Sequence, residues 1–282
     1  MITIDAPTGI GEITPGCDLT GELLRVLVPH DGDIWVVTSK VVSKAEGRFI
    51  DETDKDRARR IESRRVVARR GGTTIVEHRL GLVHAAAGID SSNVEPGRLL
   101  LLPLDPDASA RRIRAEVAER TGARIGVLIS DTSGRAWRTG QTDLAIGVAG
   151  VLPIDSHIGR TDPHGNDLRV TEIAVADELC GAADLAKTKL GGRPVAVIRG
   201  LAKLVTVDDG SSAGLLRPAA QDFFRLGRRE AVLDAVLRAT GQTDRYDELV
   251  ELDGAELVAA VTAGAPDDAD WITRLLGHAP VG

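Results

Sequence analysis

The sequence predicts an α+β protein in which mixed or antiparallel sheets pack against helices. Two β-branched runs, 33–38 and 194–200, are typical of buried strands. Residues 108–121 and 170–190 have the composition and end signals of helices. Strands and helices do not alternate regularly enough for a purely parallel sheet, so a mixed architecture is favoured.

In the first third of the chain, a strand at 33–38 leads directly into a short helix at 39–46, which ends at Gly47. Residues 54–70 have helical composition and stop at a glycine pair. We expect 73–76 and 81–86 to form an antiparallel pair after that helix.

Further along, a leucine run at 99–102 stops at a proline, and the helix at 108–121 leads to the strand that carries Asp131. Residues 133–167 are rich in Gly, Asp, Arg and His, which predicts mostly loop apart from 144–148. After Arg217 and Pro218 the sequence becomes helix-like throughout. We therefore expect a domain at 1–218 and a helical C-terminal segment at 219–282.

Composition excludes several classes of protein. A formal charge of −7 and an aromatic content of 2% argue against nucleic-acid binding. No window approaches the roughly 20 apolar residues that a membrane helix needs. Cys17 and Cys180 have no partner at zinc spacing, which indicates a reducing, cytoplasmic location with no structural disulfide.

Two aspartates follow apolar runs, Asp90 with Asn93 close by and Asp131 with Thr132 next to it. Oxygen-only ligands are those that Mg²⁺ or Mn²⁺ prefers, so both segments are candidate metal sites. The alternative is that each aspartate caps a turn by bonding its own backbone.

The usual nucleotide signatures are absent, since the sequence contains no G-x-x-x-x-G-K-[ST] and no complete G-x-G-x-x-G. Ser39, Lys40 and Lys44 lie at a strand-to-helix junction and suit phosphate oxygens. The alternative is a serine cap with solvated lysines. Arg135 and Arg138 are candidate anion contacts, or else partners of carboxylates such as Asp143.

Other polar residues favour structural roles. Asp177 and Glu178 are interpreted as a solvated helix face, with a base or second metal ligand as the alternative. His84 is expected to pack within a strand. Cys180 is expected to be a small buried hydrophobe, because no base is visible beside it.

The chain resembles the coenzyme F420:L-glutamate ligases, also called F420-0 γ-glutamyl ligases. The resemblance runs in order from about residue 8 to about residue 218 of this sequence. The motifs that carry it are 11–16, 31–48, 87–93, 102–110, 130–141 and 174–178.

This resemblance implies an enzyme that uses GTP and two divalent ions, Mg²⁺ or Mn²⁺ with K⁺ as a further candidate, to join L-glutamate to F420-0. It implies an α+β fold and a homodimer. By position, GTP binding falls on Ile10, Gly11, Glu12, Ile13, Ser39, Lys44 and Asn93, one metal on Asp90 and Asp131, and the second on Thr132. Asp90, Asp131 and Lys44 are the expected catalytic residues.

Three positions depart from the family pattern. Cys17 stands where an aspartate is common, His157 stands near the place of a tyrosine, and Ser133 replaces a bulkier apolar residue. Residues 219–282 are too few for the flavin-binding domain of longer relatives, so no flavin is expected.

The expected mechanism is activation of a carboxylate as an acyl phosphate, which the nitrogen of glutamate attacks, with further γ-linked additions also expected. Two other readings use the same residues. One is a metal-dependent phosphotransferase or phosphohydrolase, and the other is a non-catalytic nucleotide- or F420-binding protein.

Overall fold

The computed structural model describes residues 1–277 and divides into two compact units. Unit 1 comprises Met1–Thr53 and Asp90–Leu216, and unit 2 comprises Asp54–Ile89 and Arg217–Gly282. Each unit therefore combines segments that are far apart in the sequence.

Unit 1 is built on a five-stranded sheet with strand order β1-β12-β2-β8-β9. The strands are β1 (Thr3–Asp5), β12 (Val195–Arg199), β2 (Ile34–Thr38), β8 (Gly126–Arg135) and β9 (Arg138–Ala149). Only β2 and β8 are parallel neighbours in this sheet, and the other pairs are antiparallel. The sheet is therefore mixed.

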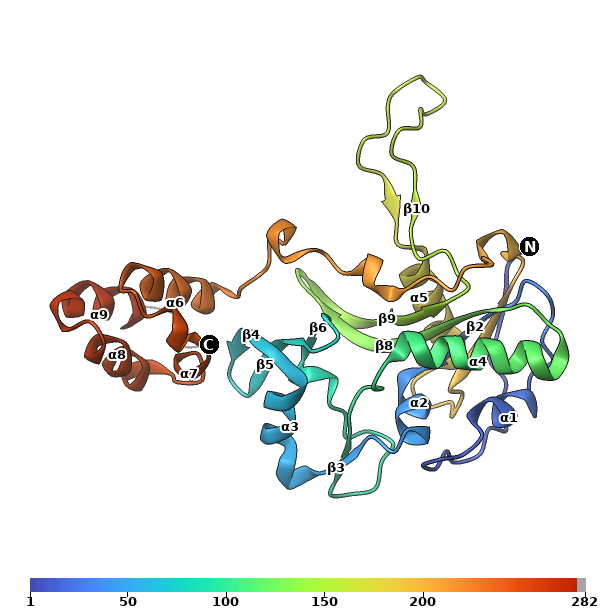
Figure 1. Cartoon of the computed structure of the whole chain (residues 1–282), viewed down its shortest axis with the longest axis horizontal. Helices are drawn as coiled ribbons and strands as arrows, with labels where there is room; N and C mark the ends of the chain where they lie inside the picture. Colours follow the sequence, from blue (N-terminus) through green and yellow to red (C-terminus); the bar gives the residue numbers. More distant parts are fainter. Residues whose placement is uncertain (278–282) are drawn as a thin grey trace. The chain divides into compact units, whose positions relative to one another are not determined.

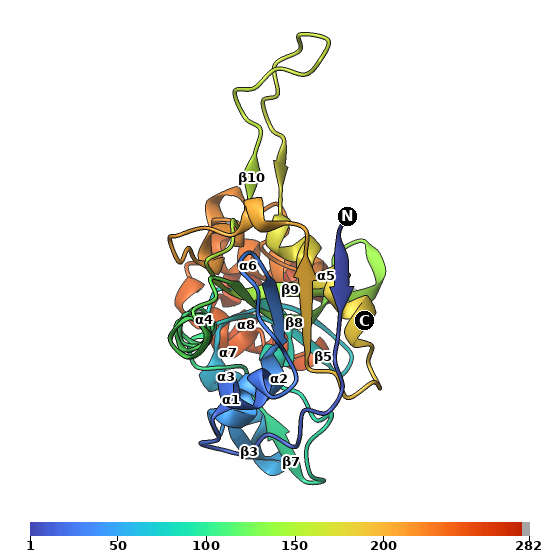
Figure 2. The ribbon, with the colours of Figure 1, turned by 90° about the vertical axis from the view of Figure 1, so that its right-hand side faces the viewer.

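Helices cover both faces of this sheet (Figure 2). Helix α5 (Val175–Lys187) packs on one face, against a core that includes Ile34, Val36 and Leu128. The other face carries α1 (Leu19–Leu24), α2 (Ser39–Ala45) and α4 (Pro106–Thr121). Because side chains alternate along a strand, consecutive residues of β8 face different helices.

Smaller elements complete unit 1. Strands β3 (Phe49–Asp51) and β7 (Arg98–Leu100) form an antiparallel pair, as do β10 (Asp155–Ser156) and β11 (Glu172–Ile173). The chain between β10 and β11 extends away from the sheet as a long arm (Figure 1). The 3₁₀ helices assigned wholly to unit 1 are η3 (Ala202–Leu204) and η4 (Ser212–Leu215).

Unit 2 combines a three-stranded antiparallel sheet with helices. The strands are β4 (Ser63–Arg70), β5 (Thr73–His78) and β6 (Val83–Ala85), preceded by α3 (Lys55–Glu62) and followed by η2 (Ala86–Gly88). The C-terminal helices are α6 (Arg228–Ala239), α7 (Tyr246–Leu249), α8 (Gly254–Ala263) and α9 (Ala269–Gly277), with the 3₁₀ turns η5 (Ala219–Gln221), η6 (Thr243–Arg245) and η7 (Pro266–Asp268). Strand and helix residues share one buried core in which Val66 and Val76 pack with Leu233, Leu237 and others.

The α+β class is confirmed, and most element predictions agree with the structure, but two are wrong. The helix expected over 54–70 ends at Glu62, where β4 begins. Val66 and Val67 are buried in β4, so tertiary burial outweighs the local helical composition. The loop expected over most of 133–167 contains the strand β9 instead, because its polar half pairs with β8 and is covered by helices.

The boundary expected after residue 218 lies close to the division between Leu216 and Arg217. The segment Asp54–Ile89, however, was expected within the N-terminal domain and groups with the C-terminal helices. The functional division into a ligase domain and a helical segment stays a prediction, and its last five residues lie outside the described part of the chain. Among the described residues, no helix is both long and apolar enough to cross a membrane.

Candidate functional site

The predicted site residues of unit 1 gather where the parallel strands β2 and β8 end. Thr38, the last residue of β2, pairs with Ser130 of β8. Helix α2 begins immediately at Ser39, and Asp131 follows Ser130. The carboxyl ends of neighbouring parallel strands open at the same edge of a sheet, which is where ligands bind in many α/β proteins.

Asp131 is held on the α2 side of the sheet. The Ser39 hydroxyl donates a 2.7 Å hydrogen bond to its Oδ1 atom. Burial raises the pKa of Asp131 from 3.8 to about 6, against the lowering effect of the Ser39 hydrogen bond. The negative charges of Asp143 and Asp90 raise it further. A carboxylate with these surroundings gains when a cation arrives beside it.

Asp90 lies within electrostatic range of Asp131, although the two are distant in sequence. Backbone bonds to Leu100 anchor Asp90, and its Oδ2 atom lies 2.6 Å from the Lys40 ammonium. Its Oδ1 atom accepts a 2.6 Å bond from the Ser92 amide. Burial acts to raise the pKa of Asp90, but the hydrogen bonds from Lys40 and Ser92 and the Lys40 charge lower it overall.

The donor set suits a hard divalent cation. Asp90 and Asp131 offer carboxylate oxygens, and Thr132 adds a hydroxyl oxygen. Within residues 1–277 no group of three or more His, Cys, Asp or Glu side chains is placed to hold a metal ion. This agrees with the way Mg²⁺ is usually bound, by one or two carboxylates together with substrate phosphates and water rather than by a protein cage.

A second polar cluster lies on the α5 side of the same strand. The hydroxyls of Ser130 and Thr132 each donate a 2.8 Å bond to Asp143 of β9. Lys187 of α5 lies 2.8 Å from Asp143 and donates to Ser130. Burial acts to raise the pKa of Asp143, but the Lys187 charge and the hydrogen bonds lower it, which keeps this carboxylate ionised.

The loop predicted to bind nucleotide lies alongside α2. The amide of Gly16 donates a 2.8 Å bond to the carbonyl of Ala45 in the last turn of that helix. Ile13 is buried, whereas Glu12 is largely exposed and its Oε1 atom lies 2.5 Å from the Lys44 ammonium. Lys44 is itself buried, so the alternative of a solvated lysine is wrong at this position.

The remaining predicted nucleotide residues lie in turns. Ile10 and Gly11 precede Glu12 in the same irregular segment, and a Cβ atom on Gly11 would meet open space. Asn93 is exposed, with a φ of +58°, in the turn that follows Asp90. Their roles in binding nucleotide stay predictions.

The structure thus brings Ser39, Lys40, Asp90, Asp131 and Thr132 to one edge of the sheet. Sequence reasoning missed three further members of the two clusters, namely Ser92, Ser130 and Lys187. Ser130 and Thr132 are two apart in a strand, so their shared face was a signal that could have been used. Lys187 had no such signal, because only tertiary packing brings α5 to β8.

Several alternatives considered for single residues are corrected. Asp143 pairs with Lys187, while Arg135 and Arg138 are exposed where β8 turns into β9. Asp177 is partly buried rather than solvated, and its Oδ1 atom accepts a 2.9 Å bond from the backbone amide of Ala145. These contacts give Asp143 and Asp177 structural partners.

The other expectations of this kind are confirmed. His84 is buried in β6, and burial together with the charge of His78 lowers its pKa to about 4. Cys180 is fully buried, and burial raises the pKa of its thiol. Both side chains act as core residues.

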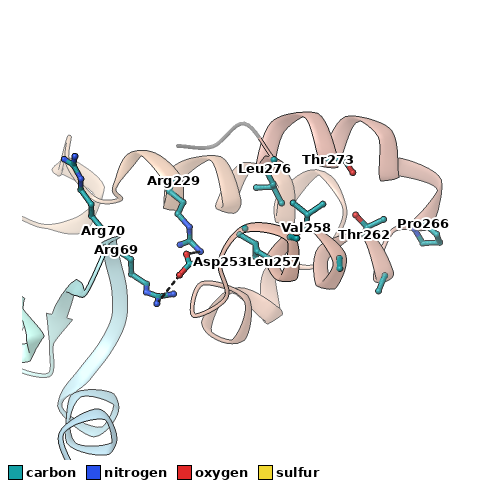
Figure 3. A pocket seen from close by; sticks show the side chains of 16 residues that line it. Arg69, Arg70, Arg229, Asp253, Leu257, Val258, Thr262, Pro266, Thr273 and Leu276 are labelled. Atoms are coloured by element: carbon teal, nitrogen blue, oxygen red, sulfur yellow. Dashed lines mark ion pairs between the residues drawn. The ribbon is translucent and has the colours of Figure 1, made fainter. Parts of the chain in front are cut away.

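A cavity of about 880 Å³ lies within unit 2, and Figure 3 shows the residues that line it. Its walls include Leu257, Val258 and Leu276, and none of the predicted site residues contributes to it. At one end Asp253 pairs with Arg69 at 3.4 Å and with Arg229 at 3.1 Å. Two of the arginines are therefore already matched by a carboxylate of the protein.

Comparison with known proteins gives one consistent result. The sequence model of the family described as F420-0:Gamma-glutamyl ligase matches residues 9–64 and 57–200. These ranges include every predicted nucleotide and metal residue. The chain from Arg217 onward, which contains α6 to α9, lies outside the match.

Three archaeal proteins named coenzyme F420:L-glutamate ligase are similar to this chain. The protein of Archaeoglobus fulgidus is 39% identical over 236 residues, covering 77% of this chain and 94% of its own length. That of Methanothermobacter thermautotrophicus is 40% identical, covering 69% and 85%. That of Methanocaldococcus jannaschii is 36% identical, covering 72% and 89%.

Proposed function

Because the chain belongs to the F420-0:gamma-glutamyl ligase family, we propose that it is a GTP-dependent ligase that joins L-glutamate to F420-0. The bond formed is an amide between the amino group of glutamate and a carboxylate of the acceptor. Further γ-linked additions of glutamate are part of the proposal. The relatives' shared name supports the substrate pair, and the family match covers the whole candidate site.

The observation that carries the proposal is the convergence of Asp90 and Asp131. These two acids are separated in the sequence but interact at the end of β8, and the repulsion between them is one cause of the raised pKa of Asp131. Two like charges held together in a partly buried place suit a site that a cation completes.

Asp90, Asp131 and Thr132 would hold Mg²⁺ or Mn²⁺ in this proposal, two ions in all, with K⁺ as a further candidate. Bound divalent ions would neutralise the charge of the triphosphate and of the transition state. No soft ligand joins these oxygens in the proposed set, so the donor chemistry fits magnesium and manganese better than zinc.

The other residues orient the reactants. A free carboxylate does not condense with an ammonium group at neutral pH, so transfer of the γ-phosphoryl group to the acceptor carboxylate, as an acyl phosphate, is the proposed activating step. The nitrogen of glutamate then attacks the acyl carbon and phosphate leaves. Ser39 and Lys44, with the loop from Ile10 to Ile13, would hold the nucleotide, so catalysis comes from orientation and charge neutralisation.

The test is incubation of the protein with F420-0, L-glutamate, GTP and Mn²⁺ or Mg²⁺, with the product identified by mass spectrometry. A ligase gives the glutamylated product and releases GDP and phosphate only when both acceptors are present. Release of phosphate without acceptors would indicate a phosphohydrolase. Tight GTP binding with no turnover would indicate a non-catalytic binding protein.

Replacing Asp131 by Asn should lower the rate of glutamylation by at least about two orders of magnitude, by analogy with the loss of one preorganised electrostatic element. Asp51→Asn changes an exposed carboxylate of the same unit and serves as the matched control. A near-normal rate for Asp131→Asn would remove the metal role of this residue. The homodimer and the cytoplasmic location stay predictions, and size-exclusion chromatography with light scattering tests the first.

A further inference from the structure

Asp143 and Lys187 form a buried ion pair behind the candidate site. Their relative exposures are 3% and 4%, and the Lys187 ammonium lies 2.8 Å from the Asp143 carboxylate. Removing two charges from water is unfavourable, and such a pair often contributes less to stability than apolar residues of similar size would. Its presence beside Asp131 and Thr132 therefore calls for a reason other than stability.

The hydrogen bonds around Asp143 fix the direction of the Thr132 hydroxyl. An ionised carboxylate only accepts hydrogen bonds, so Thr132 must use its single proton in the 2.8 Å bond to Oδ1 of Asp143. The other carboxylate oxygen accepts from Ser130 and Lys187. The lone pairs of Thr132 Oγ1 are thereby left for another partner.

A β-bulge creates this arrangement. Leu128 pairs with Val148 and Ile129 with Gly147, but Ser130 pairs with Ala145, so Ile146 is the extra residue. An unbroken register would set Thr132 opposite Leu144 and would turn Asp143 to the other face of the sheet. The backbone amide of Ala145, beside the bulge, is bonded by Asp177 of α5. Helix α5 thus holds both the bulge and the ion pair.

We propose that Asp143 and Lys187 are positioning residues that orient the Thr132 hydroxyl, so that its oxygen faces a nucleotide-bound divalent cation at the end of β8. This inference rests on the proposed function, in which Thr132 is a ligand of the second ion. Neither Asp143 nor Lys187 touches the substrate, because both are buried. They act through the hydroxyl of Thr132.

The test measures Mn²⁺ binding in the presence of saturating GDP, with free Mn²⁺ followed by electron paramagnetic resonance. The double variant Asp143→Leu with Lys187→Met removes both charges together, so no unpaired charge is left buried. Loss of a group that orients a metal ligand typically lowers affinity by about tenfold or more, and this is the expected loss. Asp184→Asn, on the same helix, is the matched control and should bind as the wild type does.

A second double variant separates orientation from general damage. Asp143→Asn with Lys187→Met keeps the shape and retains an acceptor oxygen for Thr132, so it should recover most of the affinity. Thr132→Val should lose as much affinity as the Leu/Met pair, and combining all three changes should cause no further loss, because the effects act through one hydroxyl. Melting temperatures report whether each variant is folded.

Wild-type affinity in a folded Leu/Met variant would overturn the inference, as would equal losses in the Leu/Met and Asn/Met variants. Additive losses in the triple variant would show that the pair acts separately from Thr132 and would also overturn it. Failure of the proposed function is distinguishable, because it would be absence of amide product from the wild type in an assay that does not involve these variants.

Discussion

Asp131→Asn should make the metal-free protein more stable at pH 8 while removing activity. The pKa of Asp131 lies at about 6 instead of 3.8, mainly because of burial. The folded state therefore binds a proton more tightly than the unfolded state, and stability falls as pH rises from about 4 to about 6. Above that range the full penalty of the charged form is present. Asparagine removes the charge and can still accept the hydrogen bond from Ser39.

The size of the effect follows from the shift. About two pKa units at about 1.4 kcal/mol each set an upper limit near 3 kcal/mol. Asp131 is partly exposed, and solvent screening and relaxation reduce this to an expected gain of about 1 kcal/mol. For a chain of this size that gain corresponds to a rise of roughly 2 to 4 °C in melting temperature.

The assay is thermal unfolding of both proteins in EDTA at pH 8 and at pH 4.5. We expect the variant to melt higher at pH 8 and the difference to shrink at pH 4.5, where Asp131 is protonated in the folded wild type. Added Mn²⁺ and GTP should reverse the order, because ligand at about 100 times its Kd adds about 2.7 kcal/mol to a protein that binds it. A variant that melts lower at pH 8, or a difference independent of pH, would refute the reasoning.

Three further changes test other parts of unit 1. Lys40→Met should raise the pKa of Asp90, which Lys40 now lowers, so the acid limb of the pH–activity profile should move to higher pH; an unchanged limb would contradict this role. Gly147→Ala should lower the free energy of unfolding by about 1 to 3 kcal/mol, because the new Cβ would lie 2.5 Å from the carbonyl oxygen of Pro106, whereas Gly134→Ala meets open space and should have little effect in the same denaturant titration. Iodoacetamide at pH 8 should label Cys17 but not Cys180 in the native protein, because burial raises the pKa of the Cys180 thiol; mass spectrometry that finds equal labelling before unfolding would contradict this.

Local sequence patterns were sufficient for much of the fold. The buried run at 33–38, the helix that follows it and the helix before Gly122 are set by β-branching, apolar spacing and capping residues, all of which act over a few positions. The oxygen-bearing residues at the ends of two apolar runs likewise indicated Asp90 and Asp131 as a candidate metal pair.

Tertiary structure alone decided the rest. Residues 63–70 have helical composition, but burial of Val66 and pairing with β5 make them a strand, and the polar first half of β9 is a strand because β8 and α5 supply its partners. The bulge at Ile146, the pairing of Asp143 with Lys187 and the meeting of Asp90 with Asp131 depend on contacts between residues tens of positions apart. Propensity and periodicity describe a residue's immediate neighbours, whereas burial and charge pairing depend on which distant segments the fold brings beside it.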